Sequence, residues 1–221
     1  MATIAIFGGT GYVGSAIRDE ALKRGHRVIS ITRGGAPEAA QGADSATGPE
    51  FRQGSVHHAE LVDRVAAEAD VVVVAIRYAP TADGERLIDA LPVLTSACAA
   101  RGARLGVVGG AASLHVSEGG PQLIDTPEFP DAFKGEAGSA ASALDALRAD
   151  TTGVDWFFVS PAQVFGAYAP GEALGRYRVG GDVLLKDEDG KSHISGADFA
   201  LAFADEIDNP AHHRTRFTVA Y

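Results

Sequence analysis

The feature that most constrains the fold of this chain is a short apolar segment that leads through a glycine-rich turn into a helical pattern, at Thr3–Gly14 (TIAIFGGTGYVG). Thr3–Phe7 is rich in β-branched and aromatic residues, is too short for a helix and ends at a glycine, so it predicts a buried strand. From Tyr12 onward, apolar residues recur at helical spacing. A strand, a glycine turn and a helix in this order predict a site for the phosphates of a nucleotide.

Each glycine of this motif has its own physical role. Gly8 permits the tight exit from the strand, Gly11 has no Cβ to keep a pyrophosphate from the backbone, and Gly14 lets the helix pack close to the sheet. The first helical turn offers free N–H groups and the positive end of the helix dipole. The alternative is a glycine turn without a ligand, which its place in an alternating α/β chain disfavours. The predicted contacts are Gly8, Thr10, Gly11, Tyr12, Val13 and Gly14.

Strand and helix patterns alternate along the first 160 residues or so. Strands are predicted at Thr3–Phe7, Arg27–Thr32, Glu50–Gln53, Asp70–Ile76, Leu105–Gly109 and Asp155–Ser160. Helices are predicted at Tyr12–Gly25, Ala59–Ala69, Gly84–Arg101 and Ala137–Ala149, with surface loops at Arg33–Pro49 and His115–Lys134. Pro92 is expected to kink or divide the third helix. The alternation predicts an α/β fold with a doubly wound parallel sheet.

The last third of the chain has a different character. Short strands are predicted within Gly175–Leu185, a helix at Ala197–Asp208 and a terminal strand at Arg216–Ala220. We predict a single domain over residues 1–221. Its core covers about 1–160, and a smaller C-terminal part, about 161–221, forms a lobe that faces the substrate.

Composition excludes several classes of function. A formal net charge of −10 provides no basic stripe, so we expect no nucleic acid as partner. No apolar run is long enough to span a membrane, and the N-terminus enters a strand without a signal-peptide pattern, so we predict a cytoplasmic protein with no membrane partner. Cys98 is the single cysteine and cannot form an intramolecular disulfide. Adjacent His57 and His58 make a poor metal pair, and no metal is expected.

Four segments together resemble a known family. They are GGTGYVG near the N-terminus, VVGGAASL at 107–114, WFFVSPAQVF at 156–165, and the C-terminal stretch RYRVGGDVLL…ISGADFALAFADEIDNP…RFTVAY. They look like an atypical short-chain dehydrogenase/reductase. More narrowly, they resemble the NAD(P)H-binding group provisionally named NADH-flavin reductases, related to biliverdin-reductase-B-like and NmrA-like proteins. The resemblance covers essentially the whole chain and implies a Rossmann-type fold with a bound nicotinamide cofactor.

The end of the second predicted strand bears on which nicotinamide cofactor binds. NAD sites usually have an Asp or Glu there, which binds the adenosine ribose. Here the strand ends Ile31-Thr32-Arg33, and Arg33 can offer a charged fork to a 2′-phosphate. The alternative is a solvated arginine at the start of a loop. We predict that NADPH is preferred, with NADH possible.

Further cofactor contacts are expected beyond the carboxyl ends of the strands. The family places residues near the adenine where Ser55 and Val56 stand, although related enzymes often have an acid in place of Ser55. Arg77, after the fourth strand, either contacts a phosphate or an anionic substrate or forms a salt bridge over the loop. By resemblance, Pro161–Val164 runs along the nicotinamide. The predicted contacts are Ser55, Val56, Ala75, Ile76, Arg77, Gly109, Pro161, Ala162 and Val164.

Ordinary short-chain dehydrogenases use a serine after the fifth strand and a Tyr-x-x-x-Lys pair. Ser113 matches the serine, but the chain has no Tyr-x-x-x-Lys, and Phe133 precedes Lys134 where relatives often have tyrosine. A phenyl ring cannot donate a proton. Ser113, His115 and Lys134 are the candidate catalytic residues: Ser113 to hydrogen-bond the acceptor, Lys134 to stabilise charge and His115 to donate a proton. Each has a structural alternative, as a turn cap or a solvated loop residue.

These features predict an NAD(P)H-dependent oxidoreductase that passes hydride to a flavin, a quinone or another conjugated small-molecule acceptor. Such acceptors delocalise the developing charge and can be protonated by water, so that positioning suffices. One alternative is an NmrA-like NADP(H)-binding redox sensor or regulator without turnover. Another is a tailoring reductase or isomerase of secondary metabolism. We expect a monomer or a homodimer.

Overall fold

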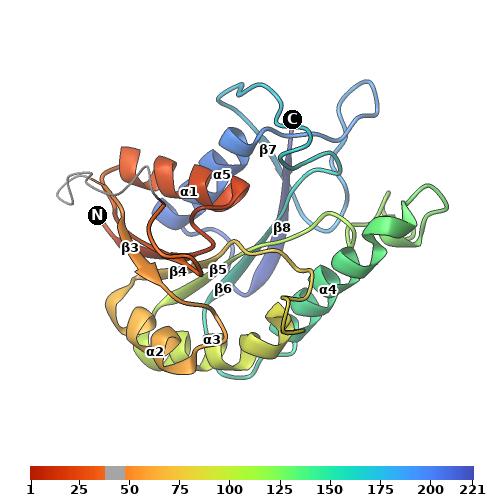
Figure 1. Cartoon of the computed structure of the whole chain (residues 1–221). Helices are drawn as coiled ribbons and strands as arrows, with labels where there is room; N and C mark the ends of the chain where they lie inside the picture. Colours follow the sequence, from red (N-terminus) through yellow and green to blue (C-terminus); the bar gives the residue numbers. More distant parts are fainter. Residues whose placement is uncertain (38–47) are drawn as a thin grey trace.

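A single mixed sheet runs through the computed structural model, which describes residues 1–37 and 48–221 (Figure 1). The strand order is β3-β2-β1-β4-β5-β6-β8-β7. Every pairing is parallel except that of β7 with β8. The strands are β1 (Thr3–Phe7), β2 (Arg27–Thr32), β3 (Glu50–Gln53), β4 (Val71–Val74), β5 (Arg104–Val108), β6 (Trp156–Ser160), β7 (Arg178–Gly180) and β8 (Thr215–Ala220). The predicted Rossmann-type doubly wound sheet is confirmed.

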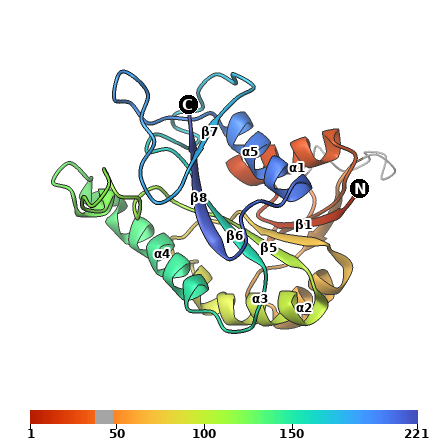
Figure 2. The same ribbon diagram turned by 180° about the vertical axis from the view of Figure 1, so that it is seen from behind.

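Helices cover both faces of this sheet. One layer holds α1 and α5, which pack on each other, and the opposite layer holds α2, α3 and α4 in sequence (Figures 1 and 2). The helices are α1 (Tyr12–Lys23), α2 (Ala59–Glu68), α3 (Leu87–Arg101), α4 (Asp131–Arg148) and α5 (Gly196–Asp208), with a short 3-10 turn, η2, at Leu123–Asp125.

The core lies between the sheet and its two helical layers. In β4 all four residues are valines and all are buried, as expected for a strand covered on both faces. Trp156, Phe157 and Phe158 of β6 are also fully buried, and consecutive residues enter the cores on opposite faces. The alternation along each strand therefore supplies both cores at once.

Two helix starts and one strand end differ from the sequence-based expectation. The helix α4 begins at Asp131, not Ala137, because Pro130 starts it and Asp131 pairs with Lys134 in its first turn. The helix α3 begins at Leu87, not Gly84, and continues through Pro92 undivided, held by a largely buried apolar face. The strand β4 ends at Val74, and the residues after it leave the sheet.

The C-terminal third is built into the same sheet. The strand β8 lies between β6 and β7. The helix α5 packs along α1, the helix that follows the glycine turn (Figure 2). Within Gly175–Leu185 the structure has one short strand, β7. Of the loop predicted at Arg33–Pro49, residues 38–47 lie outside the described part of the chain.

Candidate functional site

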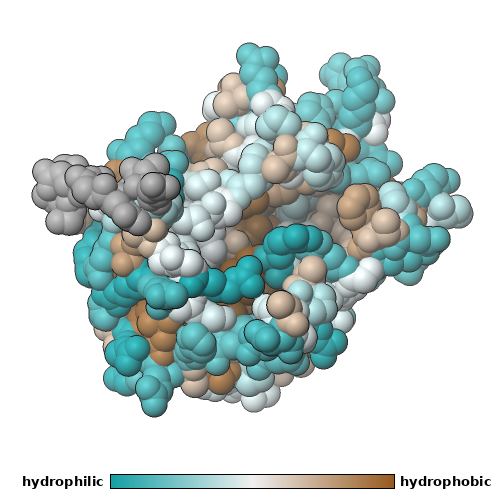
Figure 3. All heavy atoms as spheres, viewed as in Figure 1, coloured by the Kyte–Doolittle hydropathy of each residue, from teal (hydrophilic) through white to brown (hydrophobic). Residues whose placement is uncertain are grey.

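A cavity of about 470 Å³ opens where β1, β2, β3 and β4 end at their carboxyl edge. Figure 3 shows this face of the molecule hollowed near its centre, with hydrophobic residues between hydrophilic rims. The described lining residues come from the glycine turn, the end of β2, the turn after β3 and the segment after β4. They include the predicted contacts Gly8, Thr10, Gly11, Arg33, Ser55, Val56, Ala75, Ile76 and Arg77.

The glycine turn leaves an open backbone surface beside the start of α1. Gly8 has a φ of +87°, where side chains are strained, and the Gly11 N–H donates to its carbonyl at 2.9 Å. A Cβ on Gly11 would meet only the Gly8 oxygen, at 3.3 Å, so the cavity stays open above it. A Cβ on Gly14 would collide with that same oxygen. Because Gly11 caps α1 without a side chain, the first N–H groups of the helix are free to bind an anion.

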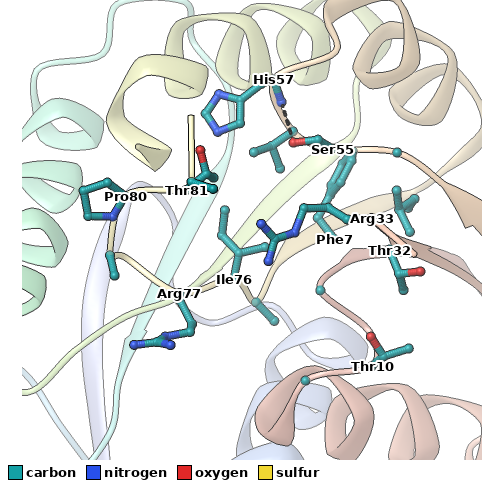
Figure 4. Close-up of a pocket in the computed structure, with 18 residues that line it drawn as sticks. Phe7, Thr10, Thr32, Arg33, Ser55, His57, Ile76, Arg77, Pro80 and Thr81 are labelled. Atoms are coloured by element: carbon teal, nitrogen blue, oxygen red, sulfur yellow. Dashed lines mark hydrogen bonds between the residues drawn. The ribbon is translucent and has the colours of Figure 1, made fainter. Parts of the chain in front are cut away.

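The side chain of Arg33 projects into the cavity from the end of β2 (Figure 4). Its backbone is held from two sides. The Arg33 carbonyl accepts a hydrogen bond from the Gln53 side chain at 3.0 Å, and the Thr32 hydroxyl donates to the Gly35 carbonyl at 2.6 Å, which fixes the turn. The anchored backbone and exposed guanidinium place a cation where a phosphate could bind.

A second arginine, Arg77, lines the cavity from the segment after β4. Its side chain is 82% exposed and lies 3.4 Å from the Glu136 carboxylate of α4. The same carboxylate accepts the backbone N–H of Tyr78 at 3.2 Å. Arg77 therefore forms the exposed salt bridge that was one prediction from the sequence. It also borders the cavity, so the other predicted role, contact with a phosphate or an anionic substrate, stays a prediction.

The other predicted cofactor contacts do not line this cavity. Tyr12 turns toward the C-terminal part: its hydroxyl donates to the Pro170 carbonyl at 3.3 Å, and its ring lies 6.0 Å from that of Phe165. Val13 packs beside the core, and a Cβ on Gly109 would collide with the Phe158 ring. The segment after β6 places Pro161 and Ala162 in the interior and Val164 at the surface, 44% exposed.

Each of the three candidate catalytic residues has a polar partner of its own. Ser113 is buried, and its hydroxyl oxygen accepts a hydrogen bond from Arg216 at 3.2 Å. His115 Nδ1 lies 2.7 Å from the Gly120 carbonyl within its own loop. Lys134 lies in α4, half exposed, and pairs with Asp131 at 2.7 Å. Within residues 1–37 and 48–221, no hydrogen bond or ion pair joins any two of the three.

Sequence reasoning missed two parts of the cavity wall. His57, considered before only as a metal ligand, lines it, with a side chain 10% exposed that lies 4.0 Å from Glu85. Residues 79–82 form another part of the wall (Figure 4). The position of His57, directly after the two expected adenine contacts, could have indicated that it lines the cavity. No pattern in the sequence indicated that residues 79–82 do so.

No set of three or more His, Cys, Asp or Glu side chains in residues 1–37 and 48–221 is arranged to hold a metal ion. None of the helices described above combines the length and the apolar character needed to cross a bilayer.

Comparison with known proteins agrees with this geometry. A family model described as NAD(P)H-binding matches residues 8–210. The uncharacterised protein YwnB of Bacillus subtilis (strain 168) is 35% identical over 217 residues, which cover 98% of this chain and 97% of YwnB.

Solved structures align along the full length. One, from Streptococcus pneumoniae TIGR4 and provisionally named an NADH-flavin reductase, is 32% identical, with a TM-score of 0.84 and coverage of 100% of this chain and 99% of that one. Another, from Bacteroides thetaiotaomicron and provisionally named an epimerase, is 33% identical, with a TM-score of 0.84 and coverage of 99% and 96%.

Proposed function

This chain belongs to the NAD(P)H-binding protein family, and on that premise we propose that it is an NADPH-preferring reductase of a conjugated small-molecule acceptor such as a flavin or a quinone. The observation that carries the proposal is the charge of the cavity wall. Its described lining residues include Arg33 and Arg77 and no Asp or Glu, although the chain as a whole carries a net charge of −10. Such a wall favours a ligand with several phosphates.

The residues present fit a dinucleotide. The open surface above Gly11 and the free N–H groups of the first turn of α1 suit a pyrophosphate. Arg33 would hold the 2′-phosphate through a charged fork, and the buried apolar side chain of Val56 would pack against the adenine. When bound, NADPH supplies a hydride, and the chain has to orient that group and exclude water.

A conjugated acceptor is favoured by what the chain lacks in sequence. It has no Tyr-x-x-x-Lys pair, and Phe133 is 58% exposed on the first turn of α4 with no group to donate. Reduction of an isolated carbonyl needs a proton donor at the oxygen that becomes an alkoxide. A flavin or quinone delocalises the added charge, and water can protonate it afterwards. One structural relative is provisionally named an NADH-flavin reductase, and that name supports the same class of reaction.

The test begins with titration of NADPH and NADH into the purified protein, with binding followed by the fluorescence of the reduced nicotinamide. Oxidation is then followed by the loss of its absorbance in the presence of riboflavin, FMN and a simple quinone. We expect tighter binding of NADPH than of NADH and turnover with at least one acceptor. Tight binding without oxidation of any acceptor would contradict the reductase and favour a redox sensor. Failure to bind either cofactor would contradict the assignment of the glycine turn.

A further inference from the structure

A buried arginine in the terminal strand contacts the serine that was singled out for catalysis. The Arg216 side chain of β8 is 1% exposed. Its Nε donates to Asp182 Oδ1 at 2.5 Å, and Nη1 donates to Ser113 Oγ at 3.2 Å and to Ser160 Oγ at 3.4 Å. Its Nη2 donates to the Ser113 carbonyl at 3.4 Å. A charge buried this deeply is retained only where its hydrogen bonds are satisfied.

These contacts join three segments, two of which lie at the carboxyl ends of the parallel strands β5 and β6, while the third follows the antiparallel strand β7. Ser113 lies in the loop after β5, Ser160 is the last residue of β6, and Asp182 follows β7. One guanidinium nitrogen serves both serine hydroxyls, so Ser113 lies beside the end of β6. Ligands of doubly wound folds bind beyond the carboxyl ends of the parallel strands. Ser113 therefore lies near Ser160, which directly precedes Pro161–Val164, the segment that we expect along the nicotinamide.

The arginine limits what the serine hydroxyl can do. A guanidinium has donors and no acceptor, so Ser113 Oγ must use a lone pair to accept from it. The hydroxyl hydrogen of Ser113 is left for another partner. In the described part of the chain, the hydroxyl donates no hydrogen bond. A hydroxyl that accepts from a cation is also a stronger donor, because successive hydrogen bonds polarise one another.

We propose that Arg216 is a positioning residue that holds Ser113 as a hydrogen-bond donor to the acceptor atom that becomes negatively charged during reduction. The proposal rests on the proposed function. Reduction moves the hydride with its electron pair to the acceptor, oxidises the nicotinamide and leaves the charge on a conjugated oxygen or nitrogen. Ser113 keeps its proton and stabilises that charge through the hydrogen bond. Water then protonates the reduced acceptor.

The experiment compares wild type, Ser113→Ala, Arg216→Lys and the double variant in kcat and KM with riboflavin or a quinone. The matched control is Arg148→Ala, because Arg148 also pairs with Asp182, at 3.0 Å, but is 44% exposed and forms no hydrogen bond with Ser113. Lysine keeps the charge but cannot reproduce the fork that reaches Ser113 and Asp182 together. The affinity for NADPH and cooperative thermal unfolding are measured on every variant to detect a merely structural effect.

We expect Ser113→Ala to lower kcat by about a hundredfold, as removal of one preorganised donor does elsewhere. Arg216→Lys should lower kcat by about tenfold in the wild-type background and cause no further loss in Ser113→Ala, because the two residues act as a unit. The affinity for NADPH and the kcat of the control should stay near wild type.

Two results would overturn this proposal alone: a wild-type kcat in Ser113→Ala, or an equal effect of Arg216→Lys in both backgrounds. If the wild-type protein fails to oxidise NADPH with every acceptor tested, the proposed function and this inference fail together.

Discussion

The hydroxyl of Tyr78 donates a hydrogen bond to the carbonyl of Val108 at 2.8 Å and so ties the segment after β4 to the end of β5. The Tyr78 side chain is buried, and burial raises the pKa of its hydroxyl, which therefore remains a donor at working pH. On the other side, its backbone N–H is held by Glu136 of α4. The cavity wall formed by residues 75–82 is thus anchored at its centre.

Tyr78→Phe should lower the free energy of unfolding by about 1–2 kcal/mol, because a buried hydrogen bond is lost and the Val108 carbonyl loses its partner. Urea denaturation measures this directly. The affinity for NADPH should fall by a few-fold, since the wall after β4 is loosened. Tyr168→Phe is the control, because that side chain is 75% exposed. Unchanged stability in Tyr78→Phe would show that the anchor contributes nothing.

Gly14→Ala and Gly138→Ala should have opposite effects, although both replace a helical glycine. A Cβ on Gly14 collides with the glycine turn, so this variant should lose stability and bind NADPH at least about tenfold more weakly. A Cβ on Gly138 meets no atom within 4 Å, so alanine there should raise the free energy of unfolding by about 0.5–1 kcal/mol. Chemical denaturation and cofactor titration check both. Normal NADPH binding by Gly14→Ala would contradict the role of the turn.

Arg33→Ala should weaken NADPH binding by about ten- to a hundredfold, as expected for a charged hydrogen bond of about 1.5–3 kcal/mol. Binding of NADH should barely change, because NADH has no 2′-phosphate. Titration of both cofactors into wild type and variant gives the comparison. Arg27→Ala, at the other end of the same strand and paired with Glu50, should leave both affinities unaltered. An equal loss for the two cofactors would rule out the assignment of Arg33.

Glu206→Gln should destabilise the protein in a pH-dependent way. The Glu206 carboxylate is almost fully buried and accepts hydrogen bonds from Arg104 at 2.7 Å and from the backbone of Ala211 and His212. Burial alone would raise its pKa, but His212 and Arg104 outweigh that effect and hold the pKa below its ordinary value of 4.5. Because the folded pKa is the lower one, the stabilisation is present above pH 4.5 and is lost as the pH falls through the folded pKa.

At neutral pH, Glu206→Gln should cost about 3 kcal/mol, since it leaves the buried Arg104 poorly compensated. The difference in free energy of unfolding between wild type and Glu206→Gln should narrow as the pH falls below 4.5. Denaturant unfolding across a pH series measures the difference, and Glu118→Gln, at an exposed position, serves as the control. A difference that stays constant with pH would mean that the ionised carboxylate is not its cause.

Local sequence patterns predicted the strands well because each is a short apolar run with a clear end. The β1 strand, the glycine turn and the α1 helix needed no tertiary information, and Thr3–Phe7 lies as predicted. The start of α4 was harder, since Gly135 and Gly138 weaken a helical pattern whose stability comes from packing of its other face. The pair Pro130–Asp131 was a readable start signal for that helix.

Contacts between distant segments left little trace in the sequence. Arg216 and Ser113 are 103 positions apart, and the pairings of β5 with β6 and of β6 with β8 bring them together. The sequence does indicate that Arg216 has a buried partner, because a charged residue that faces the core from an apolar strand requires one. The sequence does not identify that partner, since strand order and register depend on the whole fold.

The order of strands in the sheet has a consequence for biosynthesis. The β1 strand, its glycine turn and α1 precede the other strands of the sheet in the chain. The free edge of β6, however, is covered only when β8 arrives from far along the chain, and β7, made earlier, has no sheet partner until then. Before residue 215 is in place, β6 is paired with β5 alone, and the exposed edge of this fully buried strand is a template for pairing with another chain. Addition of β8 is therefore the step that protects this edge of the sheet.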